Sequence, residues 1–179
     1  KTTTSLRTVN LTPVNDTPTI ASVGSTRSYT ENAAAVTLEP GLALADVDDT
    51  QMDQAVISIA SGFVAGDRLN FSNQNGISGS YDGATGVLTL TGSATLVNYE
   101  TALRSIGFDS TSENPGSGVR TVSWTVRDVD SDAAPNGKQT SLAGTTTVNL
   151  TPVNDDPVAA NDANSIGKAS ATPVTGSVL

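Results

Sequence analysis

The chain carries the stretch VNLTPVNDDP at residues 148–157, and almost the same ten residues, VNLTPVNDTP, at residues 9–18. Nine of the ten positions are identical, and the single difference places Asp156 where the first copy has Thr17. Val148 follows Val9 by 139 positions, which is the size of a whole domain rather than of a short solenoid repeat. The repeated stretch therefore indicates a boundary that recurs between similar modules.

Each copy of the stretch combines a strand with a linker. Val9 and Leu11, like Val148 and Leu150, alternate with polar residues, as in a half-buried β-strand. A proline then ends the strand, and Asn-Asp before a second proline favours an extended linker. We expect residues 1–13 to be the last strand of a preceding repeat, 14–157 one β-sandwich module, and 158–179 the start of a following repeat. The alternative is that the first strand folds back and pairs within the central module.

The composition excludes several classes of function. The 179 residues include no cysteine and no histidine, so hydrolases that depend on a thiolate or an imidazole are excluded, and we expect no enzyme. The net charge is −9, from 18 acidic and 9 basic residues, which disfavours nucleic acid and anionic membranes as partners. The sequence has no apolar run of about 20 residues, so we expect no insertion into a membrane. An acidic chain of this kind is better suited to binding cations.

Between the two copies the pattern is β throughout. Short apolar or alternating runs are separated by Gly, Asn, Asp and Ser clusters, and they predict strands at residues 36–38, 42–45, 56–60, 87–90, 106–108, 119–126 and 145–150. Leu96, Tyr99 and Leu103 have helical spacing and predict about two turns of helix over residues 96–104. The sequence therefore predicts an all-β, antiparallel Ig-like sandwich with one short helix.

Acidic residues are concentrated where the predicted strands end. Residues 46–49 (DVDD) and 128–132 (DVDSD) each follow a strand, and Asn-Asp recurs in both linkers. Carboxylates, amides and backbone carbonyls are the oxygen ligands that Ca²⁺ prefers, whereas Mg²⁺ demands stricter geometry and keeps its waters. Each cluster taken alone is explained equally well by a turn in which the side chain accepts local N–H groups. Four clusters together favour Ca²⁺.

These motifs resemble a known family. Residues 29–32 (YTEN), 45–48 (ADVD), 126–130 (VRDVD) and 153–157 (VNDDP), in this order, are similar to the cadherin-like repeats of giant bacterial RTX-type surface adhesins. Residues 173–179 (PVTGSVL) look like the start of a VCBS-like repeat. The resemblance implies a cadherin-like sandwich that binds Ca²⁺ at both ends. The family's Leu-Asp-Arg-Glu segment has no clear match here, with Glu100 only a loose stand-in.

The resemblance assigns ligands to two sites. At the start of the module it implies Asn15 and Asp16 together with Asp46, Asp48 and Asp128, with Asp130 as a further candidate. At the end of the module it implies Glu31, Asn154 and Asp155. Because each linker site takes ligands from two modules, we expect both sites to be incomplete in this chain and to bind Ca²⁺ weakly, at about 10⁻⁴ to 10⁻³ M.

The expected function is that of a spacer. The resemblance implies a monomeric, calcium-binding extender module of a long extracellular adhesin on a bacterial cell surface, whose partners are the neighbouring repeats of its own chain. The alternative is a module that binds a carbohydrate or protein through a sandwich face. Such faces usually expose aromatic side chains, which make up only 4% of this chain.

Overall fold

The strand with the clearest alternation in the sequence forms the middle of the largest sheet. β10 (Val119–Asp128) buries Val122, Trp124 and Val126 on one face and turns polar side chains to the other. The computed structural model describes residues 1, 3–129 and 137–156. Within these residues β10 pairs with a neighbour on each side, β5 (Gln51–Ser61) and β11 (Gly144–Thr151), and both pairings are antiparallel.

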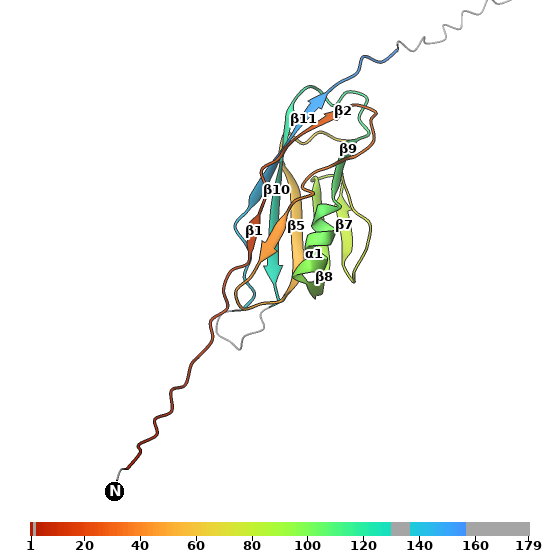
Figure 1. The fold of residues 1–179 in the computed structure, drawn as a ribbon. Coiled ribbons are helices and arrows are strands. Elements are labelled where there is room, and N and C mark those ends of the chain that lie inside the picture. Colours follow the sequence, from red (N-terminus) through yellow and green to blue (C-terminus); the bar gives the residue numbers. More distant parts are fainter. Residues whose placement is uncertain (2, 130–136, 157–179) are drawn as a thin grey trace, which may run out of the picture.

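Two β layers enclose the core (Figure 1). The first layer is a six-stranded sheet with the order β2-β11-β10-β5-β8-β7, and the second contains a three-stranded sheet, β3-β9-β6, and the pair β1-β4. All pairings are antiparallel except that of β2 with β11. The other strands are β1 (Thr19–Ala21), β2 (Thr26–Thr30), β3 (Val36–Thr37), β4 (Ala43–Ala45), β6 (Asp67–Asn70), β7 (Ser78–Asp82), β8 (Val87–Thr95) and β9 (Gly107–Ser110). The predicted all-β sandwich with one short helix is confirmed.

The helix α1 (Leu96–Arg104) has the bounds that the sequence predicts. The Thr95 hydroxyl accepts a hydrogen bond from the Asn98 N–H and caps the N-terminus. Tyr99, Ala102 and Leu103 are buried, and the helix contacts β4, β5 and β8. The apolar spacing of the segment thus specifies which face packs against the sheet. No helix in the described part of the chain is long and apolar enough to cross a membrane.

The seven predicted strand ranges each overlap a strand of the structure, but four further strands were not predicted. These are β1, β2, β6 and β7, whose sequences are short or mostly polar. They lie at sheet edges, where one side of the strand has no neighbour and apolar alternation is not required. Propensity rules based on apolar periodicity therefore miss them.

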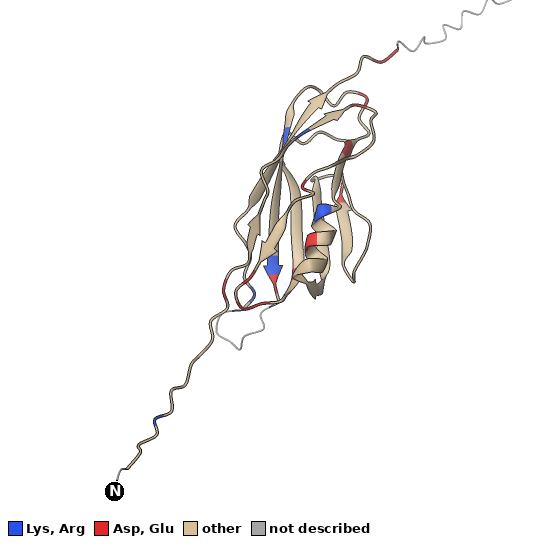
Figure 2. Cartoon of the chain, viewed as in Figure 1, with Lys and Arg blue, Asp and Glu red and all other residues tan. Residues whose placement is uncertain are grey.

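The chain enters the sandwich at one end and leaves at the other (Figure 1). Residues 3–18 form no strand or helix, and the segment before the linker extends away from the module, so it does not fold back to pair with the described part of it. Whether residues 1–13 are the last strand of a preceding repeat stays a prediction, and residues 158–179 lie outside the described residues. Acidic residues lie at both ends of the sandwich, with others along its side (Figure 2). We call these ends the N-terminal pole and the C-terminal pole and define their residues below.

Candidate metal centres at the two poles

The N-terminal pole is formed by Asn15, Asp46, Asp48, Asp49 and Asp128. Asn15 precedes β1, the three central aspartates occupy the turn between β4 and β5, and Asp128 is the last residue of β10. The antiparallel pairing of β5 with β10, with Met52 opposite Asp128, places the start of β5 beside the end of β10. The topology thus brings together side chains that lie up to 113 positions apart in the sequence.

Three aspartates at this pole each use one carboxylate oxygen to accept hydrogen bonds from backbone N–H groups. Asp46 Oδ1 accepts the N–H groups of Asp48 (3.3 Å) and Asp49 (3.2 Å), which closes the turn. Asp48 Oδ2 accepts the N–H of Asp16 (2.9 Å), which ties the linker to the turn. Asp128 Oδ1 accepts the N–H of Gln139 (2.9 Å). The turn interpretation is therefore correct for one oxygen of Asp46, whereas Asp48 and Asp128 accept N–H groups from segments that are farther away in the sequence.

The Asn15 amide is held at the centre of the pole although it belongs to the linker. Its Nδ2 donates to Asp128 Oδ2 (3.1 Å) and to the carbonyl of Gly137 (2.8 Å). Only 6% of the residue is exposed. Because both amide hydrogens are engaged, Oδ1 is left as an acceptor for a ligand within the pole. The linker thus contributes a buried oxygen to this module.

Several of the remaining oxygens of the pole are buried and lack hydrogen bonds. Among the described residues, Asn15 Oδ1, Asp46 Oδ2 and Asp48 Oδ1 are enclosed and accept no hydrogen bond. One carboxylate oxygen from each of Asp46, Asp49 and Asp128 lies within 4.8 Å of the other two. Ligands of one Ca²⁺ lie at about 2.3 to 2.6 Å from the ion, so this spacing suits a shared cation. Buried, unpaired acceptor oxygens are costly unless something electropositive is bound.

The electrostatics of the Asp46–Asp48 pair are consistent with a cation site. Burial raises the pKa of Asp46, and the neighbouring Asp48 carboxylate adds to the increase. In contrast, the N–H of Asp16 lowers the pKa of Asp48, with the Asp46 side chain contributing in the same direction. Two carboxylates in contact disfavour simultaneous ionisation. A divalent cation would relieve that repulsion.

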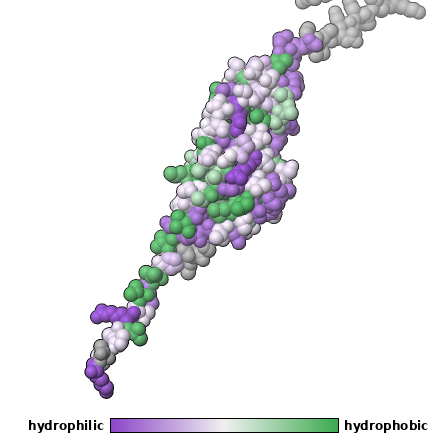
Figure 3. Space-filling view, viewed as in Figure 1, coloured by the Kyte–Doolittle hydropathy of each residue, from purple (hydrophilic) through white to green (hydrophobic). Residues whose placement is uncertain are grey.

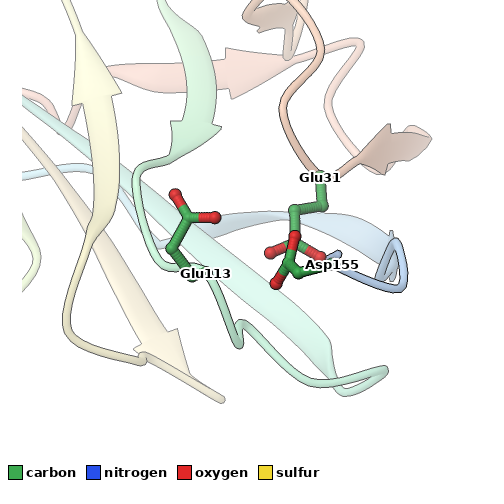
Figure 4. Close-up of side chains that lie close together, drawn as sticks. All are labelled: Glu31, Glu113 and Asp155. Atoms are coloured by element: carbon green, nitrogen blue, oxygen red, sulfur yellow. The ribbon is translucent and has the colours of Figure 1, made fainter. Parts of the chain in front are cut away.

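The C-terminal pole is formed by Glu31, Glu113 and Asp155. One carboxylate oxygen from each lies within 4.8 Å of the other two, and Figure 4 shows the three side chains converging from separate segments. Glu31 is only 3% exposed, whereas Glu113 and Asp155 are exposed. Glu31 Oε2 accepts the N–H of Val153 (2.7 Å), and its Oε1 has no hydrogen-bond partner among the described residues. This pole is therefore anchored by one buried glutamate and is otherwise open.

The loop that carries Glu113 is fastened to the core at its base. The Arg120 guanidinium forms a buried ion pair with Asp67 (2.7 Å) and also donates to the carbonyls of Pro115 (2.8 Å) and Gly118 (3.2 Å). Both side chains of the ion pair are at most 1% exposed. Arg120 thus fixes the backbone between Glu113 and β10 from within the core.

The predicted ligands are distributed as follows. Asn15, Asp46, Asp48 and Asp128 meet at the N-terminal pole, and Glu31 and Asp155 meet at the C-terminal pole. Asp16 joins the N-terminal pole through its backbone N–H, and its side chain is exposed. Asn154 is exposed, and its assignment as a ligand of the C-terminal pole stays a prediction. Asp130 lies outside the described residues.

Two members of the poles were not among the predicted ligands. Asp49 was recognised as part of the acidic turn but was not assigned a role, although it is 2% exposed and belongs to the triad. Glu113 sits in a Gly- and Pro-containing loop between β9 and β10, with no second acidic residue beside it. Glu100, considered as a stand-in, instead accepts the N–H of Leu44 (2.9 Å) and pairs with Arg104 (3.2 Å). It takes part in neither pole.

Comparison with known proteins gives one distant relative. The chain is 30% identical over 101 residues to halomucin of Haloquadratum walsbyi (strain DSM 16790 / HBSQ001), and the match covers 53% of this chain. It spans only 1% of the length of halomucin. No protein-family description matches the chain, and no solved structure matches it. The comparisons therefore indicate a β-rich segment with weak similarity to a very long protein and assign no family.

Proposed function

We propose that this chain is a calcium-binding spacer module of a long extracellular adhesion protein, in which Ca²⁺ at the ends of the module stiffens the joints between neighbours. The observation that carries the proposal is the set of buried, unpaired oxygens at the N-terminal pole, next to the Asp46, Asp49 and Asp128 triad. The proposed module acts as a monomer within its chain, and its partners are the adjacent repeats.

The donor set favours Ca²⁺ over Mg²⁺. The N-terminal pole contains four carboxylates and one amide, to which backbone carbonyls and water could be added to complete six to eight ligands. All of these donors are oxygen atoms, and the chain has no cysteine or histidine to bind zinc. Mg²⁺ requires near-ideal octahedral geometry and retains its waters, which an irregular set of side chains does not supply.

The repeated linker suggests how one joint would connect two modules. Asn15 corresponds to Asn154, and Asp16 corresponds to Asp155, because the two stretches match position by position. In the first copy the asparagine amide points into the following module, where it bonds Asp128. In the second copy the aspartate carboxylate turns back to Glu31 of the preceding module. In a complete joint, the asparagine of the linker would bind the following module and the next residue, an aspartate, would bind the preceding one. The linker would then be held at both ends and could bend little.

The wider context supports a role in a long tandem chain. The similarity to halomucin covers about a hundredth of that protein, as expected if one module of many is matched. The chain enters and leaves at opposite ends of the sandwich, so copies would line up into a rod (Figure 1). Without a cation, carboxylates crowded at a joint repel one another and the joint flexes. Extracellular calcium would remove that repulsion.

The test is a thermal melt in calcium at tens of millimolar, in magnesium at the same concentration, and in excess EDTA. The wild-type chain is compared with Asp46→Asn/Asp48→Asn, which keeps side chains able to form the turn but removes two charges. Calcium at about 100 times Kd stabilises a folded state by about 2.7 kcal/mol. We expect calcium to raise the Tm of the wild type more than magnesium does, and the double variant to lose the rise.

Asp82→Asn is the matched control. Asp82 also closes a turn, with Oδ1 accepting from Ala84 (2.9 Å) and Oδ2 from the Thr85 hydroxyl (2.8 Å), but it lies in the β7–β8 hairpin outside both poles. This variant should keep the full calcium response. If calcium shifts no Tm, or shifts the double variant as much as the wild type, the acidic turns serve only the fold and the proposal fails.

A further inference from the structure

The segment 5–12 (SLRTVNLT) and the strand β11 (GTTTVNLT) have closely similar sequences, but only β11 is part of a sheet. Thr8–Thr12 is identical to Thr147–Thr151, and the two differ only in the three preceding residues. In β11, Val148 and Leu150 are buried between β2 and β10. Their counterparts Val9 and Leu11 are 79% and 89% exposed, and Figure 3 shows apolar surface along this extension.

This duplication creates a hazard of strand exchange. A second copy of the chain can present its segment 5–12 to the position of β11, and the five identical residues would make the same pairs with β2 as β11 does. Exchange of an identical element between copies is a common route to swapped dimers, and head-to-tail exchange leads to open chains of molecules. Repeat proteins are prone to such misassembly during folding. Two of the three positions that differ, 144 and 146, would oppose this exchange.

The first discriminating position is Thr146, which corresponds to Arg7. The Thr146 hydroxyl accepts a hydrogen bond from Trp124 Nε1 (2.8 Å) and donates one to Glu39 Oε1 (2.6 Å), and the residue is 1% exposed. A guanidinium has only donors and cannot accept from the indole. It is also much larger than threonine, and a close-packed core does not accommodate the extra volume without strain.

The second discriminating position is Gly144, which corresponds to Ser5. A Cβ atom at residue 144 would lie 2.5 Å from Cγ2 of Val23 and 3.3 Å from its Cβ. Valine is branched at Cβ and has few allowed rotamers, so its side chain cannot rotate away to relieve the contact. A serine in this place would displace Val23 from the edge of the core, against which it packs.

We propose that Gly144 and Thr146, backed by Val23, Trp124 and Glu39, form a recognition key that accepts β11 and rejects segment 5–12. Segment 5–12 and β11 can therefore have the same five residues for pairing with β2. The residues before those five determine which of the two strands fits beside β2 and β10. This role does not depend on calcium. It prevents copies of the chain from exchanging their last strands as they fold.

The experiment converts the rejected strand into an accepted one. Ser5→Gly/Leu6→Thr/Arg7→Thr makes segment 5–12 identical to β11 without altering the sandwich. A reporter pair, Asn10→Cys with Ser28→Cys, is added to both backgrounds, because Asn149, the counterpart of Asn10, lies opposite Ser28 in the pairing of β11 with β2. If segment 5–12 of one copy occupies the β11 position of another, the two introduced thiols come from different copies, are adjacent, and can form a disulfide. The native chain has no other cysteine.

Both proteins are refolded from denaturant over a range of high concentrations, oxidised, and resolved on a non-reducing gel. The tethered β11 has the advantage of a high effective concentration, so exchange should grow with protein concentration. We expect a ladder of disulfide-linked oligomers in the triple-variant background, several-fold above the background with native Ser5, Leu6 and Arg7. Ser5→Ala/Leu6→Ala/Arg7→Lys, which keeps both mismatches, should behave as the native background. Equal ladders in all backgrounds, or none in the triple variant at any concentration, would overturn the proposal.

Discussion

The two poles of the sandwich both contain acidic residues, but they differ in how deeply these residues are buried. The N-terminal pole buries two of its four acidic residues, Asp49 and Asp128, includes an asparagine from the linker, and leaves three enclosed oxygens without a hydrogen bond among the described residues. The C-terminal pole has one buried glutamate and two exposed acids. Under the proposed function, the two poles would be the two halves of a joint between modules. The N-terminal pole already contains its linker side chain, Asn15, whereas the C-terminal pole would be completed by ligands from a neighbouring module.

The largest loss of stability that we predict comes from removing the buried ion pair that holds the loop of the C-terminal pole. Arg120→Met removes the cation that pairs with Asp67 in the core, leaves that carboxylate with the N–H of Val64, and releases the loop that carries Glu113. Removal of one partner of a buried ion pair costs about 3–5 kcal/mol, to be measured by urea unfolding. The control is Arg68→Met, which breaks the exposed pair with Asp109 and should cost no more than about 1 kcal/mol. Similar losses in both variants would show that the C-terminal pole has no special anchor.

The next largest effect concerns the enclosed pole. Asp128→Asn preserves the shape of a fully buried side chain but removes one charge from the triad. In calcium, the Tm should fall relative to the wild type, because the calcium-dependent stabilisation of about 2–3 kcal/mol at saturating ion is lost or reduced. In EDTA the fall in Tm should be smaller, because relief of the repulsion between carboxylates partly offsets the loss of one acceptor for Gln139 or Asn15. A loss of equal size in both conditions would mean that Asp128 acts only through Gln139 and Asn15.

A third prediction concerns Glu39, a buried carboxylate outside both poles whose charge is stabilised by hydrogen bonds and not by a cation. Burial acts to raise the pKa of Glu39, but hydrogen bonds from Thr146, Ser25 and Gly24 outweigh it, and the pKa is lowered overall. A lowered pKa in the folded state means that Glu39 stabilises the fold above its ordinary pKa, about 4.3, and that this contribution disappears as the pH falls through the folded value.

Glu39→Gln should therefore be less stable than the wild type at pH 7, and the gap should narrow as the pH falls below about 4.3. Unfolding in urea from neutral pH down to about pH 3, in EDTA throughout, measures the gap. The difference in stability should not depend on calcium. A gap that stays constant with pH, or that closes when calcium is added, would contradict the view of Glu39 as a carboxylate satisfied by hydrogen bonds alone.

The smallest effect is expected at the exposed side of the C-terminal pole. Glu113→Gln should change the calcium-dependent shift in Tm only slightly in this chain, because the site there contains one buried and two exposed acids. Isothermal titration should find the tighter of any two calcium sites unchanged in this variant and weakened in Asp128→Asn. If Glu113→Gln removes the tighter site, the ranking of the two poles is wrong.

Apolar periodicity in the sequence predicted the central elements well. The alternation around Trp124 and the helical spacing of Leu96, Tyr99 and Leu103 each correspond to an element with that burial pattern. The polar edge strands β2 and β7 have no such signal, and the partner of β2 is distant in the sequence. Local pattern determines which residues face the core, and it does not determine where an edge strand pairs.

The candidate sites were predictable where acids follow a strand and not elsewhere. Asp46 and Asp128 could be recognised because both lie just where strands end, and those strands run to the same pole. Glu113 could not, because its approach to Glu31 results from the β9–β10 loop reaching the end of β2. Nor could the sequence show that Asp46 divides its oxygens between a turn and the interior of the pole. That division is a property of the folded backbone.

The single parallel pairing in the large sheet has a mechanical consequence. β2 and β11 run side by side over five residue pairs, from Thr26 with Thr147 to Thr30 with Thr151. The chain reaches β2 from the N-terminal pole and leaves β11 at the C-terminal pole (Figure 1). Tension along the polypeptide therefore pulls the two strands past each other, so the load falls on all of their hydrogen bonds at once instead of opening them one by one. If the proposed role in adhesion is correct, this short patch of sheet would be the part of the module that resists a pulling force.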